Sequence, residues 1–273
     1  MIRYKAAAVQ MASGSNVSAN LTEVGRLIDI AVQQDASLIV LPENFAIMPV
    51  EEAERIKAAE EFGNGPIQEY VAAKAAQHKV WIVAGTIGIK TLDSDRIHST
   101  SILYNASGEI AARYDKMHLF DVSLENGEEY TESRIFEAGN NVTVVDTPFG
   151  KLGIAVCYDL RFPELFRAML DQGANIFALP SAFTSRTGKA HWEVLVRARA
   201  VENLAYVIAA GQGGYHVNGR ETHGDSMIVN PWGEILDRLP RGSGVVVAGI
   251  DLDMQQRIRA RLPSIDHRRI RHS

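Results

Sequence analysis

Short apolar runs alternate along the chain with longer segments in which apolar residues recur every three or four positions. The short runs have the length and residue types of strands, and most lack the polar alternation expected of a sheet with one solvated face. The pattern therefore predicts strands that are buried on both faces. These strands are expected at residues 5–11, 37–43, 79–87, 99–105, 151–159, 174–181, 204–212, 225–230 and 244–251.

Between these runs, three segments have the period of a helix with one apolar face. An alternation of strands and helices is typical of an α/β protein rather than of an all-α or all-β one. Because most of the strands are apolar on both sides, helices are expected to cover the outer faces of the sheets. The helical segments are residues 20–34, 66–79 and 191–203.

The order of segments also repeats within the chain. SLIVLPENF at 37–45 is similar to NIFALPSAF at 175–183, and SILYNASGEI at 101–110 aligns with SMIVNPWGEI at 226–235. The simplest architecture is two similar α/β halves packed sheet against sheet, with the helices outside. Since no proline- or serine-rich linker divides the halves, residues 1–273 are expected to form a single domain.

The repeat also relates two segments of different chemistry. AAAVQ near the start of the chain matches GIAVC, so Gln10 stands where Cys157 stands. If the halves face each other across a pseudo-twofold axis, the strand ends that carry Glu43 and Cys157 meet in one cleft. The two side chains are then candidates for a catalytic pair.

Size and charge exclude several classes of protein. The chain has 273 residues, a formal net charge of −5 and a single cysteine, whereas a general nucleic-acid-binding protein has a basic footprint. No apolar run reaches the length of a membrane span, and Gln10 interrupts the first apolar segment before it reaches the length of a signal-peptide core. A lone cysteine cannot form an internal disulfide, so we expect a cytoplasmic protein. From the charge and the lengths of the apolar runs we expect neither a nucleic-acid partner nor a membrane partner.

Cys157 has two interpretations. An unpaired cysteine is often a small buried hydrophobe, whereas a nucleophilic one needs an adjacent base or cation to form the thiolate. Glu43 follows a buried strand and is a candidate base, although it is equally well placed to be a carboxylate at the start of a helix. Lys116 could favour the thiolate and hold an oxyanion, and Glu132 could orient that lysine, but each on its own is an ordinary surface charge.

Other chemistries have weaker support. A cysteine–histidine enzyme would need a histidine near Cys157; His118 and His191 are the best placed, and both are more simply structural. The chain has no G-x-S-x-G motif, phosphate-binding loop or dinucleotide fingerprint. We also recognise no metal-ligand spacing, and so we assign no metal.

Three motifs in order resemble the nitrilase superfamily of carbon–nitrogen hydrolases. They are LPENF with Glu43, YDKMHLFDV with Lys116, and GIAVCYDLRFPELFR with Cys157. The resemblance implies a four-layer αββα sandwich, usually dimeric, so we expect a homodimer or a higher homo-oligomer. In this family pattern Glu43 is the general base, Lys116 the oxyanion and thiolate partner, and Cys157 the nucleophile. It also implies that Glu132 holds the lysine and that no metal or organic cofactor is needed.

Within the superfamily, CYDLRFPELFR and HGDSMIVNPWGEI are most similar to the deaminated glutathione amidases. That likeness implies hydrolysis of a small-molecule amide to 2-oxoglutarate and cysteinylglycine, with Arg161 binding the 2-oxo acid carboxylate and Tyr158, Phe183 and Thr184 lining the pocket. The alternative is an ω-amidase acting on 2-oxoglutaramate or 2-oxosuccinamate. A nitrilase, a carbamoyl-amine hydrolase and a non-catalytic binding protein of the same fold are further alternatives.

Overall fold

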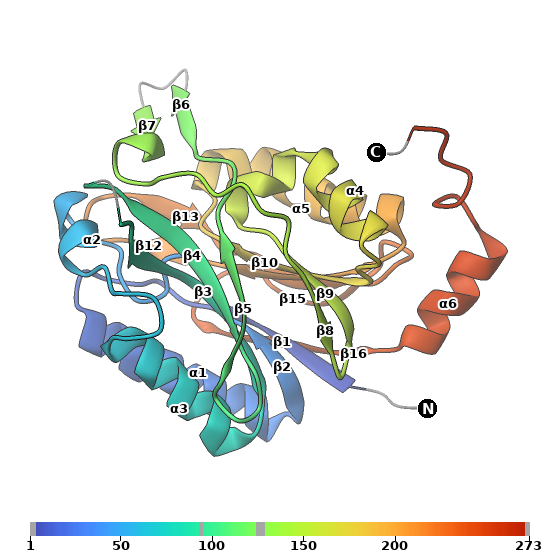
Figure 1. Ribbon diagram of the computed structural model, residues 1–273, viewed down its shortest axis with the longest axis horizontal. Helices are drawn as coiled ribbons and strands as arrows, with labels where there is room; N and C mark the ends of the chain where they lie inside the picture. The colour runs from blue at the N-terminus through green and yellow to red at the C-terminus, as the bar shows by residue number, and fades with distance from the viewer. Residues whose placement is uncertain (1–3, 93–94, 124–128, 271–273) are drawn as a thin grey trace.

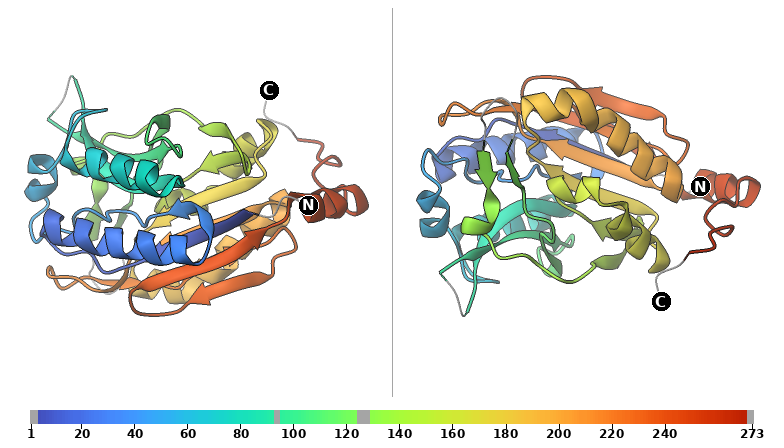
Figure 2. Two further views of the ribbon diagram at one scale, coloured as in Figure 1. Left: turned by 90° about the horizontal axis from the view of Figure 1, so that it is seen from below. Right: turned by 90° about the horizontal axis from the view of Figure 1, so that it is seen from above.

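The computed structural model describes residues 4–92, 95–123 and 129–270 and has four layers, with two sheets packed face to face and helices outside (Figures 1 and 2). Each sheet has six strands. The first has the order β16 (Gly244–Ile250), β1 (Tyr4–Gln10), β2 (Ala36–Val40), β3 (Trp81–Lys90), β4 (Ile97–Tyr104) and β5 (Ile110–Asp115). The second has the order β15 (Ile235–Leu239), β14 (Ser226–Val229), β11 (Tyr206–Gly211), β10 (Ile176–Ser181), β9 (Gly150–Ile154) and β8 (Val144–Thr147). The predicted αββα sandwich is confirmed.

Helices α1 (Val17–Gln33) and α3 (Pro66–His78) cover the first sheet, and α4 (Pro163–Asp171) and α5 (Ser185–Asn203) cover the second (Figure 2). The short α2 (Ala53–Lys57) lies at one end of the sandwich, and α6 (Leu252–Arg261) extends from the other (Figure 1). The helix starts are encoded locally: the side chain of Asn16 accepts a hydrogen bond from the Ala19 backbone as the cap of α1, and Pro66 and Pro163 occupy first turns.

The central strands are apolar on both sides because each side meets a different layer. In β1, Ala6 and Ala8 pack in the core between the sheets, whereas Ala7 and Val9 pack with the helices outside. Successive side chains of a strand point to opposite faces, so a strand buried on both faces shows an unbroken apolar run. This is the physical origin of the pattern in the sequence.

The two halves repeat the same topology. The series β1, β2, β3, β4, β5 of the first sheet corresponds to β9, β10, β11, β14, β15 of the second, with the first three strands of each series parallel and the others antiparallel. β16 and β8 pair antiparallel with β1 and β9 at corresponding positions. The internal repeat is therefore a structural duplication, completed in the first sheet by a strand from the end of the chain.

The structure differs from the predicted elements at several boundaries. The strand expected at 151–159 ends at Ile154, and Cys157 begins the 3₁₀ turn η2 (Cys157–Arg161). Strands β5, β8 and β15 were not predicted from the apolar pattern because many of their side chains are exposed or only partly buried. Two short antiparallel strand pairs complete the described fold, β6 (Asp121–Ser123) with β7 (Glu129–Thr131) and β12 (Gly213–Tyr215) with β13 (Glu221–His223).

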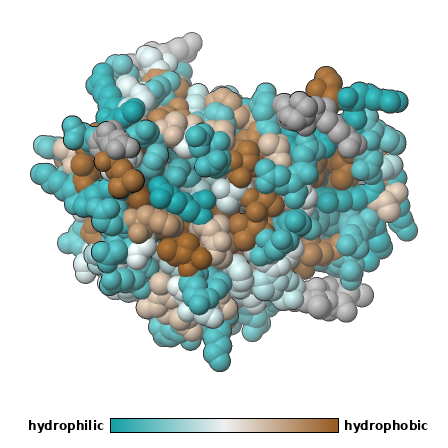
Figure 3. Space-filling model, viewed as in Figure 1, coloured by the Kyte–Doolittle hydropathy of each residue, from teal (hydrophilic) through white to brown (hydrophobic). Residues whose placement is uncertain are grey.

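The face of the molecule in Figure 3 carries apolar side chains scattered among hydrophilic ones rather than a continuous apolar belt. Among the described residues, no helix is both long and apolar enough to cross a membrane.

One close backbone approach connects the first sheet to the segment that carries Glu43. A Cβ atom placed on Gly85 in β3 would lie 1.9 Å from the carbonyl oxygen of Pro42. We expect Gly85→Ala to lower the free energy of unfolding by about 1–3 kcal/mol, because the backbone at Pro42 has to move. Urea unfolding checks this, with Gly14→Ala as the control, since a Cβ on Gly14 meets nothing within 4 Å. Equal stability of the two variants would contradict the prediction.

Candidate active site

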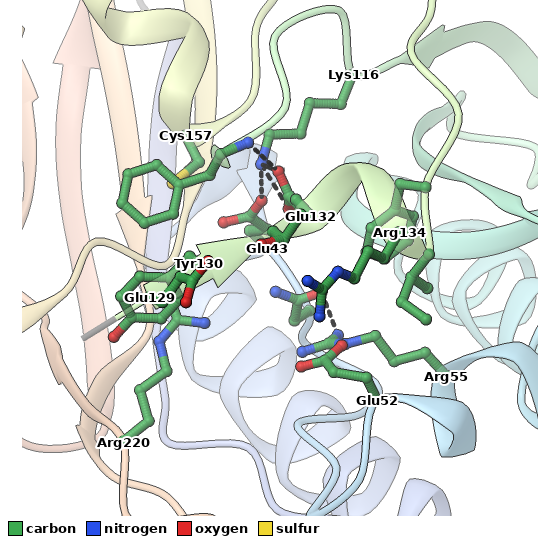
Figure 4. Close-up of a pocket in the computed structure, with 15 residues that line it drawn as sticks. Glu43, Glu52, Arg55, Lys116, Glu129, Tyr130, Glu132, Arg134, Cys157 and Arg220 are labelled. Carbon is green, nitrogen blue, oxygen red and sulfur yellow. Dashed lines mark hydrogen bonds and ion pairs between the residues drawn. The ribbon is translucent and has the colours of Figure 1, made fainter. Parts of the chain in front are cut away.

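A cavity of about 370 Å³ opens where the carboxyl ends of strands from both sheets meet (Figure 4). Glu43 follows β2 in the first sheet, and Cys157 follows β9 in the second. All four residues expected to be catalytic line this cavity. The lining residues are Glu43, Asn44, Glu52, Arg55, Lys116, Phe120, Glu129, Tyr130, Thr131, Glu132, Arg134, Ile135, Phe136, Cys157 and Arg220.

The backbone at Glu43 and at the following residue is held by hydrogen bonds to two side chains. The carbonyl oxygen of Glu43 accepts a hydrogen bond from the Gln212 amide at 3.1 Å, and the next amide, that of Asn44, donates to the Thr86 hydroxyl at 3.0 Å. Only 3% of Glu43 is exposed. The carboxylate therefore has a fixed position inside the cavity and does not cap a helix.

Lys116 is the central cation of the site. It follows β5, is 1% exposed, and places Nζ 2.8 Å from Oε1 of Glu43 and 2.8–2.9 Å from both carboxylate oxygens of Glu132. Burial alone would lower the pKa of Lys116, but the charges of Glu132 and Glu43 outweigh burial and raise this pKa above its ordinary range. Lys116 therefore stays protonated and cannot serve as a base.

Glu132 also ties the lysine to a neighbouring segment. It begins the 3₁₀ turn η1 (Glu132–Arg134), and its Oε2 accepts a hydrogen bond from the Phe120 amide at 2.7 Å. Both oxygens of this carboxylate accept from Lys116, and one of them also accepts from the backbone amide of Phe120. Its geometry suits holding the lysine rather than moving a proton.

Cys157 occupies a sharp turn. It is a non-glycine residue with φ of 48°, a left-handed conformation that is rare outside glycine, and it is 8% exposed. The buried Asp159 holds this turn, because its Oδ2 accepts hydrogen bonds from the Val156 amide at 2.8 Å and from the Tyr114 hydroxyl at 2.7 Å. In this turn conformation Cys157 lines the cavity together with Lys116, the residue that follows β5.

The thiol is neutral at rest. Burial raises the pKa of Cys157 well above its ordinary value, and the nearby Glu43 carboxylate raises it further, while Lys116 and a hydrogen bond from the Ala182 backbone partly oppose them. A group that takes the proton during attack is therefore required, and Glu43 is in hydrogen-bond contact with the thiol.

The two histidines considered in the sequence have other partners. His118 places Nδ1 2.6 Å from Asp159 and stacks on the ring of Phe162 at a centroid distance of 3.7 Å. His191 places Nδ1 3.1 Å from Nη1 of Arg161. Both contacts support a structural role for these side chains.

Three of the expected substrate-binding residues line a small cavity of about 10 Å³ beside Cys157. It is lined by Phe120, Cys157, Tyr158, Arg161, Phe183 and Thr187. The guanidinium of Arg161 lies 5.3 Å from the ring centroid of Phe183 and 5.9 Å from that of Tyr158. The fourth, Thr184, does not line this cavity; its hydroxyl caps α5, and the residue lines an outer cavity of about 800 Å³.

The sequence did not single out the arginines of the larger cavity. Arg55 is 6% exposed and donates to Glu52 and to Asn44, each at 2.8 Å. Arg134 and Arg220 reach the same cavity from η1 and from the loop before β13 (Figure 4). No local spacing marks these side chains, because they come from separate segments brought together by the fold.

Known proteins resemble this chain over nearly its full length. A family model described as carbon-nitrogen hydrolase matches residues 5–260. A protein from Synechocystis named deaminated glutathione amidase is 41% identical over 268 residues, covering 97% of this chain and 98% of that protein. One of the same name from Homo sapiens is 38% identical over 267 residues, covering 96% of this chain and 81% of that protein.

The fold also matches a solved structure over nearly the full length of both chains. The crystal structure of Nit3 from Saccharomyces cerevisiae, described as a member of branch 10 of the nitrilase superfamily, matches with a TM-score of 0.88 at 31% identity. The match covers 98% of this chain and 97% of that one.

The charges around the thiol predict its reactivity. We expect alkylation of Cys157 by iodoacetamide to be slow at pH 7 and to rise at higher pH, because burial and Glu43 raise the pKa of Cys157. Glu43→Gln removes one of these causes, so the alkylation profile should move to lower pH. Mass spectrometry of the single cysteine follows the reaction, and Glu129→Gln, in the same cavity, is the control. An unmoved profile in Glu43→Gln would contradict the electrostatic coupling.

Proposed function

This chain belongs to the carbon-nitrogen hydrolase family, and we propose that it hydrolyses the amide bond of deaminated glutathione to release 2-oxoglutarate and cysteinylglycine. The observation that carries the proposal is that the buried Glu43, Lys116 and Cys157 line one cavity with the partly buried Glu132. The names of the relatives favour this substrate over an ω-amidase substrate.

The first half of the reaction forms a thioester. Glu43 takes the proton of Cys157 as the sulfur attacks the amide carbon. Lys116 and a backbone N–H near Tyr158 hold the oxyanion of the tetrahedral intermediate. Glu43 then gives its proton to the nitrogen, the carbon–nitrogen bond breaks, and cysteinylglycine leaves.

The second half regenerates the thiol. Glu43 takes a proton from water as the water oxygen attacks the thioester carbon, and the same two donors hold the new oxyanion. The carbon–sulfur bond then breaks, the sulfur recovers a proton from Glu43, and 2-oxoglutarate leaves. Every proton moves between groups of the chain, substrate and water, so the proposed mechanism needs no metal or organic cofactor.

We propose that Arg161, which lines the small cavity beside Cys157, binds the 2-oxo acid carboxylate. Its guanidinium lies over the aromatic rings of Tyr158 and Phe183, and Thr184 lines the outer cavity. We further propose that the whole chain acts as one domain, in the cytoplasm, in repair of the glutathione pool.

Release of 2-oxoglutarate tests the function. We expect kcat/KM to be higher for deaminated glutathione than for 2-oxoglutaramate. Cys157→Ala should lose roughly 10³-fold or more in kcat, because the nucleophile is absent. Cys157→Ser should be nearly inactive, since an alcohol is much harder to ionise than a thiol. Substantial turnover by Cys157→Ala would refute the mechanism, and preference for 2-oxoglutaramate would make the enzyme an ω-amidase.

We also propose that the protein forms a homodimer through the outer side of α5. Val194 and Val201 lie two turns apart on this helix and are 62% and 47% exposed, and Trp232, 58% exposed, is adjacent to Gly233, which approaches Val201. Large exposed apolar side chains that cluster in this way are typical of an interaction surface.

Sedimentation tests the association. We expect a mass near twice the 30.0 kDa of one chain, and Val201→Asp should shift the protein toward monomer, because the charge opposes burial of this face. Leu92→Asp, at a side chain that is 97% exposed elsewhere, is the control. A dimer unaffected by Val201→Asp would place the interface on another surface.

A further inference from the structure

Arg220 lies where two cavities meet. It lines the 370 Å³ cavity that contains Cys157 and also the outer cavity of about 800 Å³, together with Thr184 and Tyr215. A group that leaves the nucleophile toward the outer cavity therefore passes this side chain. Figure 4 shows the guanidinium beneath the ring of Tyr130, on the side of the cavity away from Arg55.

The guanidinium of Arg220 is fixed in orientation. Its Nη2 donates to the carbonyl oxygen of Ala182 at 2.8 Å, and its centre lies 5.2 Å from the ring centroid of Tyr130. Ala182 belongs to the segment after β10 whose backbone also hydrogen-bonds the sulfur of Cys157. The position of Arg220 is thus tied to the position of the nucleophile.

Arg220 has no counter-ion among the described residues. Its Nε is buried without a hydrogen-bond partner, and the carboxylates of Glu52 and Glu129, which line the same cavity, form no ion pair with it. Arg55 differs, since its charge is already matched by Glu52 at 2.8 Å. A partly buried cation with an unpaired donor lowers the stability of the folded protein. An anion from outside the chain would supply both the missing counter-charge and the missing hydrogen-bond acceptor.

Arginines line both cavities beside Cys157: Arg55, Arg134 and Arg220 the larger one, and Arg161 the smaller one. Cys157 and Phe120 line both the larger cavity with Arg220 and the smaller one with Arg161, and the two cavities share no other lining residue. A substrate whose reacting carbon lies at the sulfur therefore borders both sets of lining residues, one with Arg161 and one with Arg220. This arrangement suits an amide whose two ends both carry a carboxylate.

We propose that Arg220 binds the carboxylate at the end of the leaving amine, so that the enzyme selects amides with an anionic leaving group. This inference rests on the proposed function, in which the leaving group is cysteinylglycine and the anion is its glycine carboxylate. A dipeptide spans at most about 7 Å, which sets the distance from the scissile nitrogen at which the anion is held. Arg161 binds the acyl carboxylate, and the substrate is a dianion.

The kinetic test compares three substrates. They are deaminated glutathione, the same molecule with its glycine carboxylate converted to a carboxamide, and 2-oxoglutaramate, whose leaving group is ammonia. We expect Arg220→Gln to lower kcat/KM for deaminated glutathione on the order of 10- to 100-fold, mainly through KM, and to change the values for the other two less than about twofold. Arg220→Lys should recover part of the loss, and Arg26→Gln, at an exposed side chain of α1, is the control.

A binding measurement separates this inference from the proposed function. Calorimetry of the Cys157→Ala protein should show cysteinylglycine binding more tightly than cysteinylglycinamide, and the additional Arg220→Gln change should remove the difference. Hydrolysis of deaminated glutathione and its carboxamide at equal rates by the unmodified enzyme would overturn the role of Arg220 and leave the proposed function standing. So would equal losses on all three substrates in Arg220→Gln. If deaminated glutathione is not hydrolysed, the proposed function fails, and equal binding of the two dipeptides then overturns the inference as well.

Discussion

The buried ammonium of Lys116 is the interaction on which the geometry of the site depends. A charge that is 1% exposed loses nearly all contact with water, and among the described residues its two carboxylate partners, Glu43 and Glu132, offset that loss. The partners come from different places, Glu43 from the end of β2 and Glu132 from η1, so the sandwich must bring three segments to one point. Removing one partner of such a buried set typically costs about 3–5 kcal/mol. The ion pairs thus hold the segments that carry Glu43, Lys116 and Glu132 in place beside Cys157.

The duplicated fold gives each chain one such site because the two halves carry different residues at corresponding positions. Where the second half has Cys157, the first has Gln10, whose amide donates to Gly242 and accepts from Ser226. Where the first half has Glu43, the second has Ser181, a buried hydroxyl. In the proposed mechanism the first half therefore supplies the base and the second the nucleophile, and neither half is sufficient alone.

The sequence predicted those parts of the structure that depend on neighbouring residues alone. Strands buried on both faces, such as β1 and β10, appear as apolar runs, and the motifs around Glu43, Lys116 and Cys157 are contiguous. The end of β9 was placed five residues too late because the apolar run continues through Val156, while the side chain of Asp159 folds the backbone into η2. The position of Arg220 was missed for a different reason: its partners Ala182 and Tyr130 are distant in sequence, and only the tertiary fold assembles them.

The resting charges also explain why a neutral thiol suits the proposed reaction. At rest the set contains the cation Lys116, the carboxylates Glu43 and Glu132, and a neutral Cys157, so its net charge is −1. When Glu43 takes the thiol proton and the substrate carbonyl becomes an oxyanion, one negative charge has moved from the carboxylate to that oxygen and the total is unchanged. Lys116 loses its ion pair with Glu43 when that carboxylate is protonated but keeps the pair with Glu132, so its ammonium is available to attract the oxyanion. Because the net charge of these groups stays the same, attack does not add a new charge to the site. The raised pKa keeps the thiol of Cys157 protonated until the sulfur attacks a bound substrate.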